Sequence, residues 1–276
     1  MNLEKRLDEL GSVIQKGEEI FELSQEKFLK EFAILPNEIT IGMLLFRKVI
    51  EKLDAIFILI ENGSEMSAES ITRDLFENLL YLKFLLKKDY FERRALSYQY
   101  AVLEDKLDFC NLVSSNHKKG QGIRDYINKE LPLRQIQKQK EIVKNAMNKE
   151  CYKNIKIEWE RIKKKGGYPK WYSLFKGPRT IKELAIDCKF EPVYHILYRI
   201  YSKQVHSGNA LEQIGKMENS LIGIKDLRGN ENSDTILLNA RSFGLHAIRE
   251  YVNFFSLEST KEQAEWYKAN IEKMKR

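Results

Sequence analysis

Four polar side chains within the segment 194–209 are of the types used in acid–base and phosphate chemistry: His195, Arg199, Ser202 and His206. Steps of four, three and four residues return to the same side of an α-helix, so a helix here would carry all four on one face. Imidazole exchanges protons near neutral pH, and guanidinium stabilises a phosphate that gains negative charge. We take the four as candidate catalytic residues. A satisfied structural hydrogen-bond network and simple exposure are the alternatives.

An apolar and aromatic seam lies beside this polar face, formed at helical spacing by Tyr194, Tyr198, Tyr201 and Val205. Such a seam is typical of a helix face that packs against another helix. Ser, Gly and Asn at 207–209 mark the expected end of the helix. His206 is then in the last turn, where the helix dipole favours the protonated imidazole.

A second set of charges interrupts the leucine-rich segment 66–88. Arg73 and Glu77 are one helical turn apart, with Glu69 one turn before them and Tyr81 one turn after. A charge within so apolar a helix must be paired or used, although an ordinary i,i+4 ion pair is the simpler interpretation. We add Arg73 and Glu77 to the candidate catalytic residues. We expect this helix to pack against 191–206, with Arg73 or Glu77 contacting the Arg199 or His206 side chain.

The chain as a whole favours the all-α class, because its apolar residues recur near a period of 3.6 and only five prolines interrupt the 276 residues. We expect helices at 3–31, 37–61, 66–88, 90–115, 122–147, 149–164, 180–187, 191–206, 233–257 and 260–274. The predicted architecture is an N-terminal helix at 1–35 and a single helical domain at 36–276. That domain is a multi-helix bundle with its core in 36–115 and 180–257 and a basic helical insertion at 118–176.

The net charge of +7 is unevenly distributed. Segment 118–176 holds 17 Lys and Arg against 6 Asp and Glu, a local net charge of +11. Such a surface favours phosphate, and the interleaved Tyr152, Trp159, Tyr168 and Trp171 could stack on bases of single-stranded RNA. The tentative nucleic-acid residues are Lys163, Lys164, Lys165, Lys170 and Trp171. A solvated lysine-rich hairpin is the alternative.

Several function classes lack their motifs. The sequence has no apolar run long enough to cross a bilayer and no signal peptide, so we expect a cytoplasmic protein without membrane association. Cys110, Cys151 and Cys188 have neither disulfide-framework nor zinc spacing. Di-iron, zinc-protease and Walker motifs are absent from the sequence, and Ser202 beside His206 lacks an oxyanion-hole signal. We expect no metal and no cofactor.

Spaced motifs in the chain resemble a bacterial family known as domain of unknown function 5677. The resemblance rests on Arg73-x-x-x-Glu77, a tryptophan-containing loop, and Tyr198-x-x-x-Ser202-x-x-x-His206 followed by Gly208. It covers roughly residues 40–255. It implies that Arg73, Glu77, Ser202 and His206 matter, without naming their chemistry.

The chain also resembles the HEPN superfamily, helical nucleases and nucleotide-binding proteins found in toxin and phage-defence systems, which use an arginine followed by a nearby histidine. Arg199-x6-His206 and Arg241-x4-His246 both fit that spacing. The first pair shares a helix face and the second does not, so we prefer the first. In that family the residue after the arginine is usually polar; here it is Ile200 in the first pair and Ser242 in the second.

The HEPN resemblance implies a metal-independent ribonuclease or toxin-type effector, possible roles in phage defence with a partner protein, and a site completed across a two-fold homodimer. The alternative function is a non-catalytic helical module that binds a nucleotide, nucleic acid or partner protein.

Overall fold

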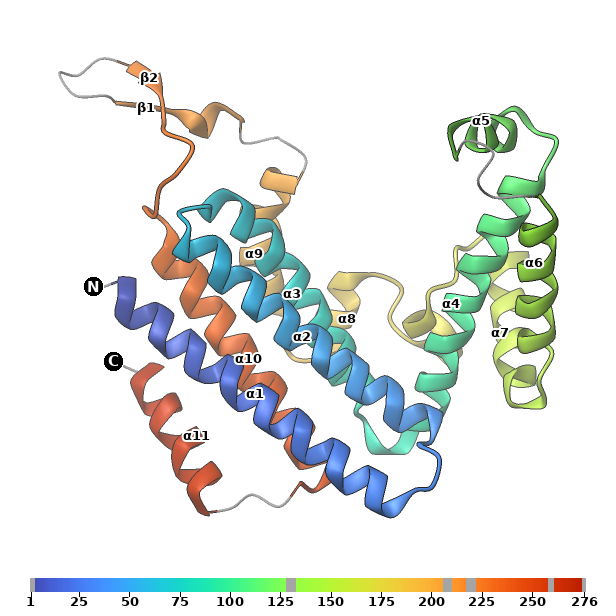
Figure 1. The fold of residues 1–276 in the computed structure, drawn as a ribbon, viewed down its shortest axis with the longest axis horizontal. Coiled ribbons are helices and arrows are strands. Elements are labelled where there is room, and N and C mark those ends of the chain that lie inside the picture. The colour runs from blue at the N-terminus through green and yellow to red at the C-terminus, as the bar shows by residue number, and fades with distance from the viewer. Residues whose placement is uncertain (1–2, 128–132, 206–209, 217–221, 258–260, 275–276) are drawn as a thin grey trace. The chain divides into compact units, whose positions relative to one another are not determined.

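The computed structural model describes residues 3–127, 133–205, 210–216, 222–257 and 261–274, and confirms the all-α class (Figure 1). The α-helices are α1 Leu3–Glu31, α2 Asn37–Glu61, α3 Glu65–Leu85, α4 Phe91–Ser114, α5 Lys118–Ile127, α6 Leu133–Met147, α7 Lys153–Lys164, α8 Ile181–Asp187, α9 Glu191–Val205, α10 Ser233–Phe255 and α11 Lys261–Met274. Short 3-10 helices occupy Lys88–Tyr90, Glu150–Tyr152, Trp171–Lys176 and Ala210–Gln213.

Two details differ from the sequence expectation. The expected helix 122–147 is instead two helices, α5 and α6, and the sequence places Pro132 immediately before α6, where a proline disfavours continuation of a preceding helix. A two-stranded antiparallel hairpin also occurs, with β1 Ile214–Lys216 paired to β2 Ile222–Ile224. Its three-residue strands are too short to leave a clear alternating pattern.

The chain forms two compact units. Unit 1 comprises Met1–Asp89 and Ile181–Arg276, and unit 2 comprises Tyr90–Thr180. The contacts group α4 with the basic segment, and α1 packs on α2 and α10. The domain division expected from the sequence stays a prediction.

Unit 1 is a helical bundle in which α1, α2, α3 and α10 lie side by side (Figure 1). Each helix buries a stripe at helical spacing, and the ring of Tyr251 in α10 stacks on Phe46 of α2 with centroids 4.0 Å apart. The Tyr251 hydroxyl donates a hydrogen bond to Ser24 Oγ at 2.9 Å, so its polar atom is satisfied in the core.

Close packing inside unit 1 depends on a glycine. A Cβ atom at Gly244 of α10 would lie 2.7 Å from a methyl of Val13 and 2.9 Å from a methyl of Leu53. Only a residue without a side chain allows α10 to approach α1 and α2 this closely. The same helix buries Arg241, whose side chain is 2% exposed.

Unit 2 packs α6 and α7 with its 3-10 segments against α4. Its core is aromatic: Trp159 meets Tyr100 edge to face at 5.5 Å, and Tyr152 lies 5.8 Å from the same ring. Leu174, in the segment Trp171–Lys176, belongs to this cluster. The lysines of α7 therefore lie on its outer side, as amphipathic spacing requires.

None of the helices in the described ranges combines the length and the apolar character that a membrane span needs. All three cysteines are free, with Cys110 and Cys188 buried and Cys151 exposed.

Candidate functional site

The α9 helix, which carries most of the predicted site, packs against α3 as expected. Pro192 is in the first turn of α9, where a backbone N–H has no acceptor within the helix, so proline loses no hydrogen bond there. The buried Tyr201 and Leu197 side chains hold the apolar side of α9 in the bundle. This packing brings the charges of α3 to the tyrosine seam of α9.

Arg73 and Glu77 of α3 meet Tyr198 of α9. The Tyr198 hydroxyl donates a hydrogen bond to Glu77 Oε1, and the Arg73 guanidinium carbon lies 4.4 Å from the centre of the Tyr198 ring. The Arg73 Nε atom lies 3.4 Å from the same carboxylate oxygen. The side chains of Arg73 and Glu77 are only 19% and 22% exposed, so the three groups form one semi-enclosed network.

The network keeps Tyr198 protonated. Burial and the hydrogen bond to Glu77 raise the pKa of Tyr198, while the Arg73 charge acts against that rise. Burial acts to lower the pKa of Arg73, but its interactions with Tyr198 and Glu77 raise the pKa overall. Tyr198 is therefore a hydrogen-bond donor, and Arg73 is a fixed cation.

The structure describes only part of the polar face of α9. Arg199 and Ser202 lie within the helix, but their side chains are outside the described part, and His206 lies outside the described residues altogether. The predicted contact of Arg73 or Glu77 with Arg199 or His206 therefore stays a prediction. His195 has a half-exposed side chain with Nε2 3.6 Å from Glu191 Oε1.

Sequence reasoning placed Tyr198 in the seam and in the family motif, but not among the site residues, and overlooked the hydrogen bond from its hydroxyl to Glu77. It also missed how far the polar face of α3 extends. Glu65 and Glu69 precede Arg73 at intervals of four, and both are buried. Glu65 accepts a hydrogen bond from the Asn232 backbone N–H at 2.7 Å. The signal that could have found this face is the run of charges at i, i+4, i+8 and i+12 in one apolar helix.

The side chains of the other arginine–histidine pair, Arg241 and His246, contact different partners. Arg241 donates to Glu9 Oε2 at 2.9 Å and to the carbonyl and side-chain oxygens of Asn270 at 3.0 and 3.1 Å. His246 instead has Nδ1 3.1 Å from Arg249 Nη2, with its ring edge-on to Phe190. The two residues thus have separate partners, and Arg241 is committed to holding α1 and α11 on α10.

The electrostatics around His246 keep it neutral. Burial lowers the pKa of His246, and the nearby charges of Arg249 and Lys83 lower it further, against the opposing effect of Glu250. A neutral imidazole accepts a hydrogen bond from the guanidinium of Arg249. This histidine is thus a poor candidate for the protonated acid of a reaction.

Of the lysines predicted to bind nucleic acid, two are exposed and two contact other side chains. Lys164 and Lys165 are exposed at the end of α7, and Lys163 Nζ pairs with Glu104 at 2.7 Å. Lys170 is half-buried, with Nζ 5.6 Å from the Tyr172 ring centre.

Trp171 cannot serve as a stacking surface in this fold. Its side chain is 8% exposed and packs edge-on against Tyr98 and Tyr172. Tyr152, at the end of the 3-10 helix Glu150–Tyr152, and Trp159, on the apolar face of α7, are likewise core residues. Of the four aromatics expected to stack on bases, only Tyr168, at 79% exposure, has an open ring.

No cluster of three or more His, Cys, Asp or Glu with metal-binding proximity occurs among the residues described. The expectation that the protein needs neither metal nor cofactor stays a prediction.

Comparison with known proteins identifies one family. The model of a family of unknown function, DUF5677, matches residues 39–221, about two thirds of the chain. The matched region includes α3 and α9, the two helices that form the Arg73–Glu77–Tyr198 network. Neither a curated protein nor a solved structure matches the chain. The resemblance to HEPN nucleases stays a prediction.

Proposed function

The chain belongs to DUF5677, a family of unknown function, and we propose that it cleaves RNA without a metal, at the polar face of α9 that α3 supports. The observation that carries this proposal is the network of Arg73, Glu77 and Tyr198. It fixes α9 at Tyr198, which is one residue before Arg199, four before Ser202 and eight before His206. Groups that transfer protons or stabilise charge need such positional support from packed neighbours.

The residues supply what transesterification of RNA requires. His206 takes the proton of the 2′-hydroxyl, and the 2′-oxygen then attacks phosphorus. The bond from phosphorus to the 5′-oxygen breaks, and that oxygen receives a proton from a second acid, for which the His206 of a second copy is our assignment. Arg199 stabilises the charge on the phosphorane. The products are a 2′,3′-cyclic phosphate and a 5′-hydroxyl.

Supporting residues have distinct parts in this proposal. Arg73 and Glu77 are positioning residues that act through Tyr198, because their described contacts are with that side chain. Ser202 and His195 lie on the same side of α9 as Arg199 by helical spacing and contact the substrate.

Unit 2 supplies phosphate binding in the same proposal. Lys164 and Lys165 are exposed, and the open ring of Tyr168 provides a stacking face on the loop that follows α7. Single-stranded RNA is held by this combination of cation and ring. Lys163 contributes less, because Glu104 neutralises it.

One observation favours the second candidate function, a non-catalytic module that binds a nucleotide, nucleic acid or partner protein. The hydroxyl of Tyr198 and the carboxylate of Glu77 satisfy one another, as in a structural network that fixes helix packing. In a module of this kind, loss of Tyr198 would weaken folding and binding, with no chemical step to lose.

The test is a cleavage assay with purified protein and labelled cellular RNA in EDTA, followed by analysis of fragment ends. Wild type should leave 2′,3′-cyclic phosphates, and His206→Ala should leave the RNA intact. His117→Ala is the matched control, because His117 is an exposed histidine of unit 2 and should cleave as wild type. Intact RNA with folded wild type would favour the binding module, and a filter-binding assay would then measure RNA affinity.

The toxin-type role has its own test. Induced expression of wild type in a bacterial host should arrest growth, whereas His206→Ala at equal abundance should not. Equal growth of both strains would contradict the toxin-type role. The RNA cleavage proposal would then still be tested by the assay with labelled RNA.

A further inference from the structure

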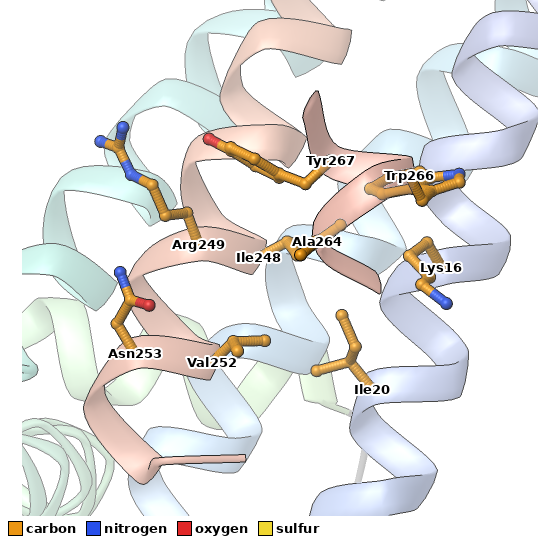
Figure 2. A pocket seen from close by; sticks show the side chains of 9 residues that line it. All are labelled: Lys16, Ile20, Ile248, Arg249, Val252, Asn253, Ala264, Trp266 and Tyr267. Atoms are coloured by element: carbon orange, nitrogen blue, oxygen red, sulfur yellow. The ribbon is translucent and has the colours of Figure 1, made fainter. Parts of the chain in front are cut away.

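A pocket of about 310 Å³ lies between α1, α10 and α11, outside the region that the family model matches (Figure 2). Its middle is apolar, lined by Ile20, Ile248, Val252 and Ala264. Figure 2 shows Lys16 and Trp266 on one side of this apolar patch and Arg249 on the other. A volume of this size is at the lower end of the range for small-molecule sites.

The wall contributed by α11 is fixed to the bundle by polar contacts. Trp266 Nε1 donates to Ser12 Oγ of α1 at 3.3 Å. One turn later, Asn270 accepts two hydrogen bonds from the buried Arg241 of α10. The pocket is therefore a consequence of specific helix packing, and it uses elements that the proposed RNA site does not.

Among the lining residues that the structure describes, the ionised side chains are cations and none is a carboxylate. The two cations are Lys16 and Arg249. Arg249 Nη2 lies 3.4 Å from Glu250 Oε1, but the same carboxylate oxygen is 3.2 Å from Lys83 Nζ, so two cations share one acid. At the opposite side, Lys16 pairs with Glu19 at 2.8 Å. The Arg249 side thus has the surplus of positive charge.

A polar donor accompanies that surplus. The Tyr267 hydroxyl is buried, and Figure 2 shows it directed toward the side of the pocket where Arg249 lies. Burial raises the pKa of Tyr267, and the Arg249 charge opposes that rise. A guanidinium and a phenol on one side of an apolar patch suit an anionic oxygen acid attached to an apolar body.

We propose that this pocket binds a small organic carboxylate with an apolar body. The carboxylate pairs with Arg249 and accepts a hydrogen bond from Tyr267. The apolar body lies against Ile20 and Val252. Recognition needs both parts, since Arg249 alone is solvated and the apolar patch alone does not select for charge.

Isothermal titration calorimetry with octanoate tests the site in the full-length protein. Octanoate should bind saturably with one site per chain, whereas octan-1-ol and acetate, which each lack one part, should give no saturable heat. Arg249→Gln should weaken octanoate binding about tenfold, because it removes the charge that pairs with the carboxylate. Lys30→Gln is the matched control, an exposed cation of α1 away from the lining, and should bind as wild type.

A filling variant separates pocket loss from misfolding. Ala264 is exposed to the pocket, so Ala264→Phe should abolish octanoate binding while the circular dichroism spectrum and melting temperature stay near wild type. The proposal is overturned if octanoate does not bind wild type. It is also overturned if octanol binds equally well, or if both Arg249→Gln and Ala264→Phe bind as wild type. RNA cleavage by these variants should be unchanged in every case.

Discussion

In unit 1, several charged side chains lie within the bundle and have partners, whereas in unit 2 most of the described lysines are exposed and aromatic rings fill the core. Arg241 and the Arg73–Glu77 pair are surrounded by apolar helices, yet each has an ion-pair or hydrogen-bond partner. In unit 2, Trp159 and Trp171 are buried among rings while Lys164 is exposed. A charge inside an apolar helix is thus the more informative signal, because its burial has to be compensated.

The substitution with the largest expected effect on stability removes the buried guanidinium of Arg241. Arg241→Met should lower the free energy of unfolding by about 3–5 kcal/mol, because it removes the buried hydrogen bonds to Glu9 and to two oxygens of Asn270. Arg6 remains beside the Glu9 carboxylate at 3.2 Å. Urea denaturation measures the change. The double variant with Glu9→Gln should recover part of the loss, and the exposed Arg134→Met of unit 2 should change stability by less than about 0.5 kcal/mol.

Removal of a core ring should be nearly as costly in unit 2. Trp159→Ala should destabilise by about 3–5 kcal/mol, since it opens a cavity beside Tyr100. Tyr168→Ala, at an open ring, should leave the denaturation midpoint unchanged and weaken RNA binding. Similar melting of the two variants would contradict the division between core and surface aromatics.

These two units also show what the sequence could predict. The 3.6-residue spacing of apolar residues was sufficient to predict most of the helices and the packing of α3 on α9, because both depend on apolar stripes. The expectation that the aromatics of segment 118–176 stack on bases was wrong for most of them. An amphipathic helix has interleaved lysines and aromatics whether it binds RNA or packs against a core. Trp171 is the clearest case, since its burial depends on Tyr98, which is distant in the sequence.

The candidate site was predictable only in part for a related reason. Arg73 and Glu77 stood out as charges in an apolar helix, but Tyr198 did not, because a tyrosine in a seam is ordinary core until its hydroxyl finds a partner. The pocket beside Arg249 was missed altogether. It is assembled from α1 and from the much later helices α10 and α11, so no local spacing indicates it.

The α3–α9 network should give a smaller but diagnostic effect. Tyr198→Phe should destabilise by about 1.5 kcal/mol, because Glu77 loses its donor. A cycle with Glu77→Gln should show coupling, measured by chemical denaturation. Additive effects of the two substitutions would mean that the hydrogen bond does not join the helices. If Tyr198 is a positioning residue, Tyr198→Phe should also lower the cleavage rate more than RNA affinity.

A pH series tests the neutral histidine of unit 1. Because the folded pKa of His246 is lowered, the unfolded chain takes up the proton first as the pH falls below about 6.5, and stability is lost there. Denaturation at pH 7.5 and 5.5 should show a larger decrease for wild type than for His246→Phe. An equal decrease would mean that His246 is not the group responsible.

The smallest expected effect concerns the exposed lysines of unit 2. Lys164→Gln with Lys165→Gln should reduce the salt dependence of RNA binding by about 1.4 in slope, since each phosphate contact contributes about 0.7 on single strands. Lys153→Gln is the control, because that lysine pairs with Glu150. An unchanged slope for the double variant would place the RNA elsewhere.

The most direct test of the central claim is the single-turnover cleavage rate of two histidine variants in EDTA. If α9 carries the chemistry, His206→Ala should lose cleavage by at least about a hundredfold, the usual scale for a general acid or base. His246→Ala should stay within a few-fold of wild type, because that neutral imidazole is occupied by Arg249. Full activity of His206→Ala, or loss only in His246→Ala, would contradict the account.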